Sequence, residues 1–340
     1  MPTPLESRRI VIAGASSLLG AELKSLLEES RFAASDFRLV DEETVAGTLT
    51  EAGGEPAVIQ PVEEDSFSKA WTIFFAGSPA FTKANLSLAK SSGARIIDLS
   101  GELAGQQGVT TWLSKPLDGS PVSAASSDED LFAIPSASAE IIARLALALR
   151  SFAPSAVSAV AFQPVSAAGK AGIEELEVQT TRLLSFQPVG KEVFDSQVAY
   201  TMLDRFGDSS SHSLSHSLEI LRREVKACLP IQAAPIAVQL LHAPVFYGST
   251  VAACAFLPAR SEVSAVAKLC TDAGFTLTAS ETPPSNVSSA GEIALQLAAP
   301  SPDSSVANAL WFWAAADNIR LPAMNAIKLA EQLIAQKMNG

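Results

Sequence analysis

The stretch from Arg8 to Glu29, RRIVIAGASSLLGAELKSLLEE, constrains the fold more than any other part of the chain. Its β-branched run ends at Gly14, as a buried strand does before a tight turn. Gly14 permits the turn, backbone amides at the helix start can hold a pyrophosphate, and Gly20 lets the helix approach the sheet. Apolar residues then follow at helical spacing: Leu18, Leu19, Leu23, Leu26 and Leu27. We predict a strand, a phosphate-binding turn and an amphipathic helix; the alternative is a tight turn without ligand.

The same alternation of strand and helix continues along the first part of the chain. The strand-like runs are FRLVD, WTIFFAG and ARIIDLS, and a helical stretch lies between Ala80 and Ser92. This order is typical of an α/β fold with a Rossmann-type, doubly wound parallel sheet. We assign it to a domain of residues 1–137, completed by a C-terminal helix at 322–340.

The pattern changes after residue 138. A helix expected at about 139–151 is followed by the alternating runs VSAVAFQPVS, AAPIAVQLLHAPVFY and STVAACAFLPA. These runs suit an antiparallel or mixed sheet with helices on one face, in an α+β domain of residues 138–321. The segment GDSSSHSLSHS is predicted to be a loop that precedes the helix SLEILRREVKACL.

Composition supports two domains and gives no sign of a metal centre. A chain of 340 residues is too long for one ordinary core. The cysteines and histidines are few and scattered: Cys228, Cys254, Cys270, His212, His216 and His242. The cysteines lie in apolar surroundings without a close pair, which predicts buried thiols rather than disulfides or zinc ligands. Two of the histidines are spaced by four, but the serines around them favour a solvated loop over a metal site.

Charge and hydropathy exclude several partners. A net charge of −12 opposes binding to nucleic acid or to an anionic membrane through bulk electrostatics. No run approaches the ~18 apolar residues of a transmembrane helix. The first residues, MPTPLESRRIVIAGASS, lack the basic-then-apolar order of a secretory signal. We therefore expect a cytoplasmic protein.

Several motifs, in order over nearly the whole chain, resemble those of the aspartate-semialdehyde dehydrogenase family. The glycine turn resembles G-A-T-G-x-V-G, with Ser17 at the second glycine. FFAGS resembles its S-A-G turn, IIDLSGEL its V-I-D-N-S-S-A-F-R, and FQPVSAAGKAGIEELEVQT its Y-Q-A-V-S-G-A-G…E-E-L…Q-T. Three later segments match in the same way. HAPVFYGST resembles R-V-P-V-x-x-G-H-S, and PPSNVSSAG resembles P-T-P…V-x-G. Near the end of the chain, WFWAAADNIRLPAMNAIKLAE resembles W-x-x-x-D-N-L-R-K-G-A-A-x-N. The chain is identified as a degenerate member similar to the USG-1-like homologues.

The resemblance implies a second domain like that of glyceraldehyde-3-phosphate dehydrogenase, through which the family forms homodimers. It also implies a reaction, the reductive dephosphorylation of aspartyl phosphate with NADPH. A cysteine thiolate attacks the acyl phosphate, and the resulting thioester accepts a hydride. The reaction needs a nucleophile, a base, oxyanion donors and cations for the carboxylate and phosphate.

Four of the family's functional positions are vacated in this chain. The cysteine of N-P-x-C-S-T corresponds to Ala137, and the histidine of G-H-S to Ser249. His242 stands where the resemblance implies a carboxylate-binding arginine, and Ala104 where it implies a phosphate-binding arginine. The substrate-orienting glutamine is retained as Gln163. Loss of one member of a nucleophile–base unit lowers the rate about 10⁴- to 10⁶-fold. Four changes in one site therefore predict that the chain has lost the family's reaction.

The cofactor site that the resemblance and the glycine turn imply comprises Gly14, Ser16, Ser17, Leu18, Leu19, Asp41, Gly77 and Asn318. The family's S-x-R, which holds the 2′-phosphate of NADP, corresponds to Glu42-Glu43-Thr44. Carboxylates there repel a 2′-phosphate, whereas Asp41 or Glu42 can accept a hydrogen bond from a free ribose hydroxyl. NAD is thus favoured over NADP if a dinucleotide binds. A non-catalytic role requires no cofactor. Two alternatives follow: the chain binds NAD or NADP weakly, or it binds neither.

Three hypotheses follow. The first is a non-catalytic, homodimeric homologue with a structural, regulatory or ligand-sensing role, whose protein partner, if any, is unidentified. The second is an active NAD(P)-dependent aspartate-semialdehyde dehydrogenase, an oxidoreductase of lysine, threonine and methionine biosynthesis. The third is an NAD-dependent sensor that binds the nucleotide without turnover.

Overall fold

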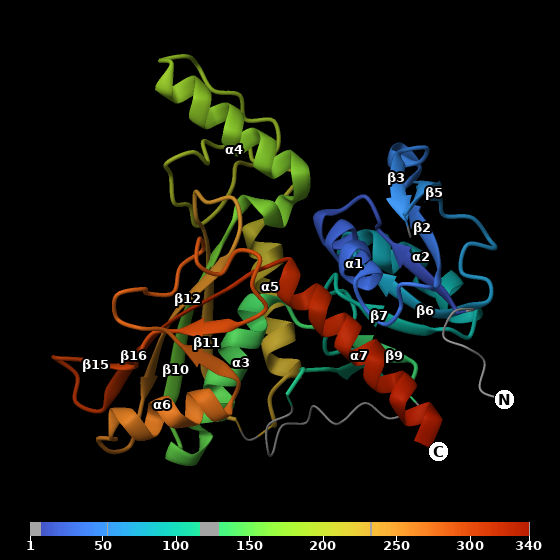
Figure 1. Ribbon diagram of the computed structural model, residues 1–340. Helices are drawn as coiled ribbons and strands as arrows, with labels where there is room; N and C mark the ends of the chain where they lie inside the picture. Colours follow the sequence, from blue (N-terminus) through green and yellow to red (C-terminus); the bar gives the residue numbers. More distant parts are fainter. Residues whose placement is uncertain (1–7, 53, 116–128, 232, 340) are drawn as a thin grey trace. The chain divides into compact units, whose positions relative to one another are not determined.

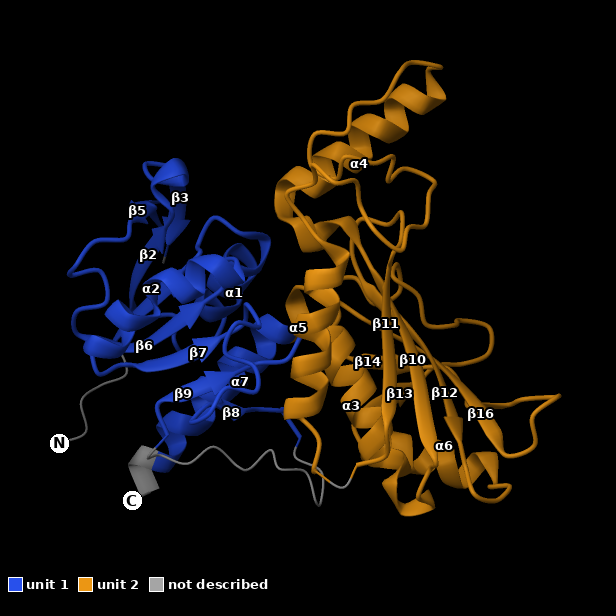
Figure 2. Cartoon of the chain, turned by 180° about the vertical axis from the view of Figure 1, so that it is seen from behind, with its two compact units in different colours: residues 1–116, 122–136, 322–340 blue, residues 117–121, 137–321 orange. Residues whose placement is uncertain are grey.

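The structure is a computed structural model that describes all residues except 1–7, 53, 116–128, 232 and 340 (Figure 1). Two predictions therefore concern residues that are partly outside this description. One is the absence of a secretory signal at the start of the chain, and the other is the 1–137 domain. Two compact units are distinguished in Figure 2. Unit 1 comprises residues 1–116, 122–136 and 322–340, and unit 2 comprises residues 117–121 and 137–321.

The core of unit 1 is the predicted parallel sheet. Its strands, in spatial order, are β5 (Gln60–Pro61), β2 (Asp36–Asp41), β1 (Arg9–Ala13), β6 (Ala70–Phe75), β7 (Arg95–Asp98), β9 (Leu131–Ala133) and β8 (Thr110–Thr111). Every neighbouring pair is parallel. The strand order reverses at β1, with β2 on one side and β6 on the other. A doubly wound sheet binds ligands outside the carboxyl ends of its strands at such a point.

Helices cover both faces of this sheet (Figure 1). The helices α1 (Leu18–Glu28) and α7 (Arg320–Asn339) share an apolar cluster with one face, and α2 (Pro79–Ser91) packs on the other. A hairpin of β3 (Leu49–Ala52) and β4 (Glu55–Val58) and a 3₁₀ turn at Glu43–Val45 complete the unit. The helix α7 begins two residues before the predicted start at 322.

The sheet of unit 2 is mixed. Its strands, in spatial order, are β11 (Ile236–His242), β10 (Ala156–Gln163), β12 (Ser249–Phe256), β16 (Ala309–Ala316), β14 (Leu295–Leu297) and β13 (Phe275–Leu277), and β15 (Ser301–Pro302) pairs with β16. β10 runs parallel to β11 and antiparallel to β12. The chain between β10 and β11 passes through two helices before it returns, which allows parallel pairing.

Three helices pack against one face of this sheet: α3 (Ala137–Leu149), α5 (Leu214–Ala227) and α6 (Val263–Asp272). A 3₁₀ turn (Arg150–Phe152) follows α3, and a second (Val165–Ala168) leads into α4 (Gly169–Leu184). Figure 1 shows α4 extending beyond the end of the sheet. Gln179 of α4 holds the following segment, because its Oε1 accepts hydrogen bonds from the amides of Val198 (2.7 Å) and Ala199 (3.1 Å).

Two predicted boundaries in unit 2 are wrong. The helix expected at about 139–151 begins at Ala137. The segment GDSSSHSLSHS is not a loop throughout, because α5 begins at Leu214 within it. Ser213 caps this helix, accepting a hydrogen bond from the amide of His216 at 3.2 Å, and Leu214 is buried. His216 therefore lies exposed in the first helical turn, while His212 precedes the helix.

All three cysteines are free and buried, as predicted. Burial is the main factor that raises the pKa of each thiol, to about 12 for Cys270. The thiols are therefore protonated near neutral pH, and they are poor nucleophiles. Within the described part of the chain, no helix combines the length and the apolar character that crossing a membrane requires.

Candidate functional site

The turn after β1 depends on two close backbone approaches. Gly14 has a φ of +90°, and a Cβ atom there would lie 2.2 Å from the backbone nitrogen of Gly77. A Cβ atom on Gly20 would lie 2.3 Å from the carbonyl oxygen of Gly14. Both positions thus require glycine, and α1 starts directly against the turn.

Ser17, at the family's second glycine, has a structural role of its own. Its Oγ donates a hydrogen bond to the carbonyl of Ala76 at 2.8 Å. The same oxygen accepts one from the amide of Gly20 at 2.8 Å and so caps α1. Its φ of −65° is ordinary for any residue. Ser17 therefore links the turn after β1 to the turn after β6.

Most backbone amides of the glycine turn already have acceptors. The amides of Gly14 and Ala15 donate to the Val40 carbonyl, at 2.8 and 3.3 Å. The amide of Ser16 donates to the Asp41 carboxylate. The amide of Ser17 donates to the Gly14 carbonyl at 3.2 Å. The amides of Leu18 and Leu19 are the first of α1 and have no carbonyl of their own helix to bond. They are the amides that suit a bound diphosphate.

An acidic cleft of about 600 Å³ opens beside this turn. Its acidic members are Asp41, Glu42, Glu43 and Glu63, and its other lining residues are Pro61, Val62, Ala80, Phe81, Ala84 and Asn85. These carboxylates offer hydrogen-bond acceptors and negative charge only. The cleft suits a ribose with free hydroxyls and does not suit a 2′-phosphate.

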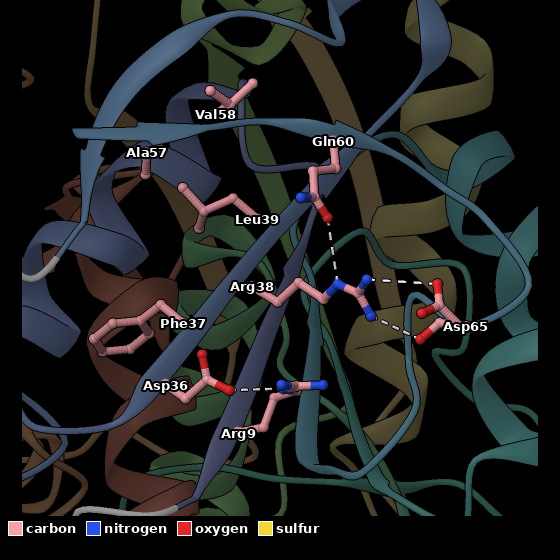
Figure 3. Close-up of a pocket in the computed structure, with 9 residues that line it drawn as sticks. All are labelled: Arg9, Asp36, Phe37, Arg38, Leu39, Ala57, Val58, Gln60 and Asp65. Atoms are coloured by element: carbon pink, nitrogen blue, oxygen red, sulfur yellow. Dashed lines mark hydrogen bonds and ion pairs between the residues drawn. The ribbon is translucent and has the colours of Figure 1, made fainter. Parts of the chain in front are cut away.

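Figure 3 shows a second pocket of unit 1, of about 510 Å³, whose lining includes no residue of the turn. Two ion pairs cross it, Arg9 Nε to Asp36 Oδ2 at 2.8 Å and Arg38 to Asp65 at 3.4 Å. Arg9 and Asp36 are the first residues of their strands. The pocket therefore lies toward the amino ends of the strands, where a doubly wound sheet does not bind its ligand.

In unit 2, four of the predicted site positions come together at one end of the sheet. Gln163 ends β10 and is in register with His242, which ends β11. Ser249 begins the antiparallel β12, and Asn318 follows β16, whose Ala316 is in register with Ser249. Sequence order alone does not give this convergence, because it depends on the mixed pairing.

His242 cannot replace an arginine at this end of the sheet. Its side chain is buried, with 1% of the residue exposed. Its ring centroid lies 6.1 Å from that of Phe194 and 5.6 Å from that of Phe206, and Nε2 is 3.4 Å from the Val198 carbonyl. Burial lowers the pKa of His242, an effect that the Val198 contact partly opposes. The imidazole is neutral near pH 7 and offers no cation to a carboxylate.

This burial predicts how stability depends on pH. The pKa values of His242 and His212 are lowered in the folded protein, in each case mainly by burial, whereas the unfolded value is about 6.5. Below pH 6.5 these two residues therefore bind more protons in the unfolded chain, and their contribution to stability falls until pH drops below their folded pKa values. Urea unfolding at pH 7.5 and 5.5 measures the change. His242→Phe should make it smaller, whereas His216→Phe, at an exposed position, should not.

Asn318 makes two structural hydrogen bonds. Its Oδ1 accepts from the amide of Gly248 at 2.8 Å, and its Nδ2 donates to Ser166 Oγ at 3.0 Å. These bonds connect the start of β12 to the 3₁₀ turn before α4. The residue predicted to contact a nicotinamide amide thus has partners within its own unit.

The remaining positions of the predicted site are two alanines, a glutamine and a serine. Ala137 and Ala104 are buried methyl groups in units 2 and 1 respectively. Gln163 is partly buried, and Ser249 is buried. Among the described residues, neither side chain has a hydrogen-bond partner. Within the part of the chain that the structure describes, the Ser249 hydroxyl therefore has no base hydrogen-bonded to it.

Two contacts near the predicted site are not predicted by the sequence. One is the bond between Asp41 and the Ser16 amide, residues 25 apart in sequence. The other involves Asp317, whose Oδ1 accepts from the amides of Ile319 and Arg320 at the start of α7, while Oδ2 accepts from Gly291. An aspartate just before a helix is a recognisable capping signal. The Asp41 contact has no comparable local signal.

Comparison with known families matches both units. A family model described as "Semialdehyde dehydrogenase, NAD binding domain" matches residues 9–116. A second, described as "Semialdehyde dehydrogenase, dimerisation domain", matches residues 145–321. The parallel sheet thus lies mainly in the first matched region and the mixed sheet in the second.

Individual relatives match over nearly the full chain. A USG-1 protein homolog of Azotobacter vinelandii is 30% identical, over 96% of this chain and 98% of that protein. An aspartate-semialdehyde dehydrogenase of Shewanella violacea is 26% identical, over 96% and 97%. Among solved structures, a probable aspartate-semialdehyde dehydrogenase from Pseudomonas aeruginosa has a TM-score of 0.84 at 24% identity, covering 97% of this chain and 99% of its own. One from Candida albicans, solved with NADP, has a TM-score of 0.64 at 12% identity, over 98% and 99%. These structures share the fold.

Proposed function

Because the chain belongs to the semialdehyde dehydrogenase family, we propose that it is a catalytically silent member with a structural, regulatory or ligand-sensing role. The observation that supports this most strongly is the methyl group of Ala137, buried at the start of α3. A methyl group cannot form the acyl-enzyme on which the family's reaction depends. A turnover assay with aspartate semialdehyde, phosphate and NADP⁺ tests the proposal.

The second candidate is an active aspartate-semialdehyde dehydrogenase, the activity named for several relatives. Gln163 favours it, because this side chain retains the family's substrate-orienting residue and is partly exposed. Turnover that is abolished by Gln163→Ala would support this candidate and contradict the first. The active enzyme would act in amino-acid biosynthesis in the cytoplasm, where we also place the silent protein.

We assign nucleotide binding to residues 1–137 with 322–340, and dimerisation to residues 138–321. The Leu18 and Leu19 amides would hold the diphosphate, and Glu42 would accept from a ribose hydroxyl. A bound dinucleotide would supply hydride chemistry in an active relative. The acidic cleft supports NAD over NADP, and the proposed role requires neither. Thermal-shift titration with each separates a sensor from a scaffold, because a bound ligand raises the melting temperature.

We propose that the chain forms a homodimer through the open face of the unit 2 sheet. Leu310, Phe312 and Ala314 of β16 face the helices, so the alternate residues Trp311 and Trp313 face away from them. These tryptophans are 46% and 37% exposed. Exposed aromatic residues of this size are typical of interface centres. No other protein partner is identified by the exposed residues.

Trp311→Glu is expected to raise the dimer dissociation constant at least about 30-fold, the effect of losing an interface residue worth about 2 kcal/mol or more. Light scattering after size-exclusion chromatography over a dilution series measures it. Leu49→Glu is the matched control, because Leu49 is 77% exposed but lies on the hairpin of unit 1. A dimer that survives Trp311→Glu unchanged would place the interface elsewhere.

A further inference from the structure

The end of β2 places a carboxylate against the glycine turn. Asp41 is the last residue of β2, and its Oδ2 accepts a hydrogen bond from the Ser16 amide at 2.7 Å. Its Oδ1 accepts one from the amide of Glu42 at 2.8 Å. Asp41 is only 6% exposed. Both carboxylate oxygens are therefore engaged by backbone donors of the protein.

A bound phosphate and the Asp41 carboxylate would compete for the same hydrogen-bond donor, the Ser16 amide. Phosphate groups bind at such turns because backbone N–H groups at the helix start point toward them. The Ser16 amide carries one proton, and Asp41 Oδ2 accepts it at a distance typical of a strong, charge-assisted bond. A phosphate oxygen entering here would also meet a like charge at close range.

The usual role of an acidic residue at this position is to bind the ribose hydroxyls of a dinucleotide. The burial and backbone bonds of Asp41 disfavour that role. Glu42 and Glu43 are exposed and line the same cleft, so they are better placed to meet a ribose.

We propose that Asp41 is an internal competitor for the phosphate-binding turn. It occupies the Ser16 amide and leaves a nucleotide diphosphate only the Leu18 and Leu19 amides. The ligand class is an adenine dinucleotide with a free 2′-hydroxyl, bound weakly while Asp41 holds the turn. This inference deepens the nucleotide-binding part of the proposed function and rests on it. It is tested by binding, so it can fail while catalytic silence holds.

Asp41→Ala removes the competitor and exposes the Ser16 amide. It is expected to bind NAD⁺ about tenfold more tightly than the unaltered chain, the gain from one hydrogen bond to a charged group. Isothermal titration calorimetry with NAD⁺ and NADP⁺ measures both affinities. NADP⁺ should remain the weaker ligand, because Glu42 and Glu43 still face the cleft.

Glu63→Ala is the matched control, because Glu63 is exposed, lines the same cleft and has no proposed role in binding the ribose. It removes one carboxylate from the same cleft, but leaves the bond between Asp41 and Ser16 in place, so NAD⁺ affinity should change less than about threefold. Equal gains in both variants would attribute the effect to general charge and overturn the proposal. Weaker NAD⁺ binding by Asp41→Ala alone would mean that Asp41 binds the ribose, which also overturns it.

A second pair of variants keeps the test independent of folding. Asp41→Asn removes the charge but retains an oxygen that can accept from Ser16, so its gain should lie between the unaltered chain and Asp41→Ala. Glu63→Gln is its control. If Asp41→Ala does not fold, a larger gain for Asp41→Asn than for Glu63→Gln still supports the proposal. The proposal is rejected if the Asp41 variants bind NAD⁺ with the same affinity as the unaltered chain. It is also rejected if no folded variant shows detectable NAD⁺ binding.

Discussion

Purified protein mixed with aspartate semialdehyde, phosphate and NADP⁺ is expected to form NADPH at least about 10⁴-fold more slowly than an active member of the family. A nucleophile and its base act as a unit, and losing one member costs about 10⁴- to 10⁶-fold in rate. The proposed silence assigns Ala137 to the first position and Ser249 to the second. His242 adds a further loss, because a buried neutral imidazole cannot pair with the substrate carboxylate. Absorbance at 340 nm is a sufficient measurement.

Restoring the two reactive groups should recover little. Ala137→Cys with Ser249→His supplies a nucleophile and a base, yet His242 and Ala104 would still provide no cations for the carboxylate and phosphate. Each lost charge contact is worth about 2–5 kcal/mol. Turnover by the unaltered chain, lost in Gln163→Ala, would contradict catalytic silence. Full activity of the double variant would instead show that the two arginine positions are dispensable.

The largest effect on stability is expected at an ion pair inside unit 2. Arg144 Nε lies 2.8 Å from Glu140 Oε1 within α3, and each side chain is 1% exposed. Arg144 also donates to the carbonyl of Ala273, which follows α6. Arg144→Met should lower the free energy of unfolding by about 3–5 kcal/mol, because it leaves a buried carboxylate without its countercharge. Urea unfolding followed by circular dichroism measures this loss.

The chain contains a matched control for this pair. Lys268 and Asp272 of α6 have the same spacing and nearly the same distance, 2.9 Å, but their side chains are 76% and 57% exposed. Lys268→Met should change stability by less than about 1 kcal/mol. Glu140→Leu combined with Arg144→Met should cost less than Arg144→Met alone, because the Glu140 carboxylate is removed together with its countercharge. Equal costs for Arg144→Met and Lys268→Met would mean that burial does not determine the effect.

Local patterns predicted unit 1 better than unit 2. The strand, turn and helix around Gly14 could be predicted because each depends on neighbouring residues. The parallel pairing of β10 and β11 could not be predicted, because it depends on the path of about 70 intervening residues. The start of α5 was missed because serine is typical of both loops and helix caps, and Ser213 is a cap.

The candidate site also contains features that the sequence predicts and features that it does not. Motif spacing identified Ala137, Gln163, His242 and Ser249 as positions of interest, since each lies in a recognisable segment. It could not predict that His242 is enclosed by Phe194 and Phe206, which come from a distant part of the chain. Nor could it predict that the Asp41 carboxylate meets the Ser16 amide, because that contact joins the ends of two different strands.

The hydrogen bonds of Asn318 bear on how such chains are classified. Its side chain connects Gly248 to Ser166 whether or not a substrate is ever bound. Replacing it would therefore be costly even in a protein under no selection for turnover. A residue with such a structural role can persist for architectural reasons alone, so the presence of Asn318 is not by itself evidence of turnover.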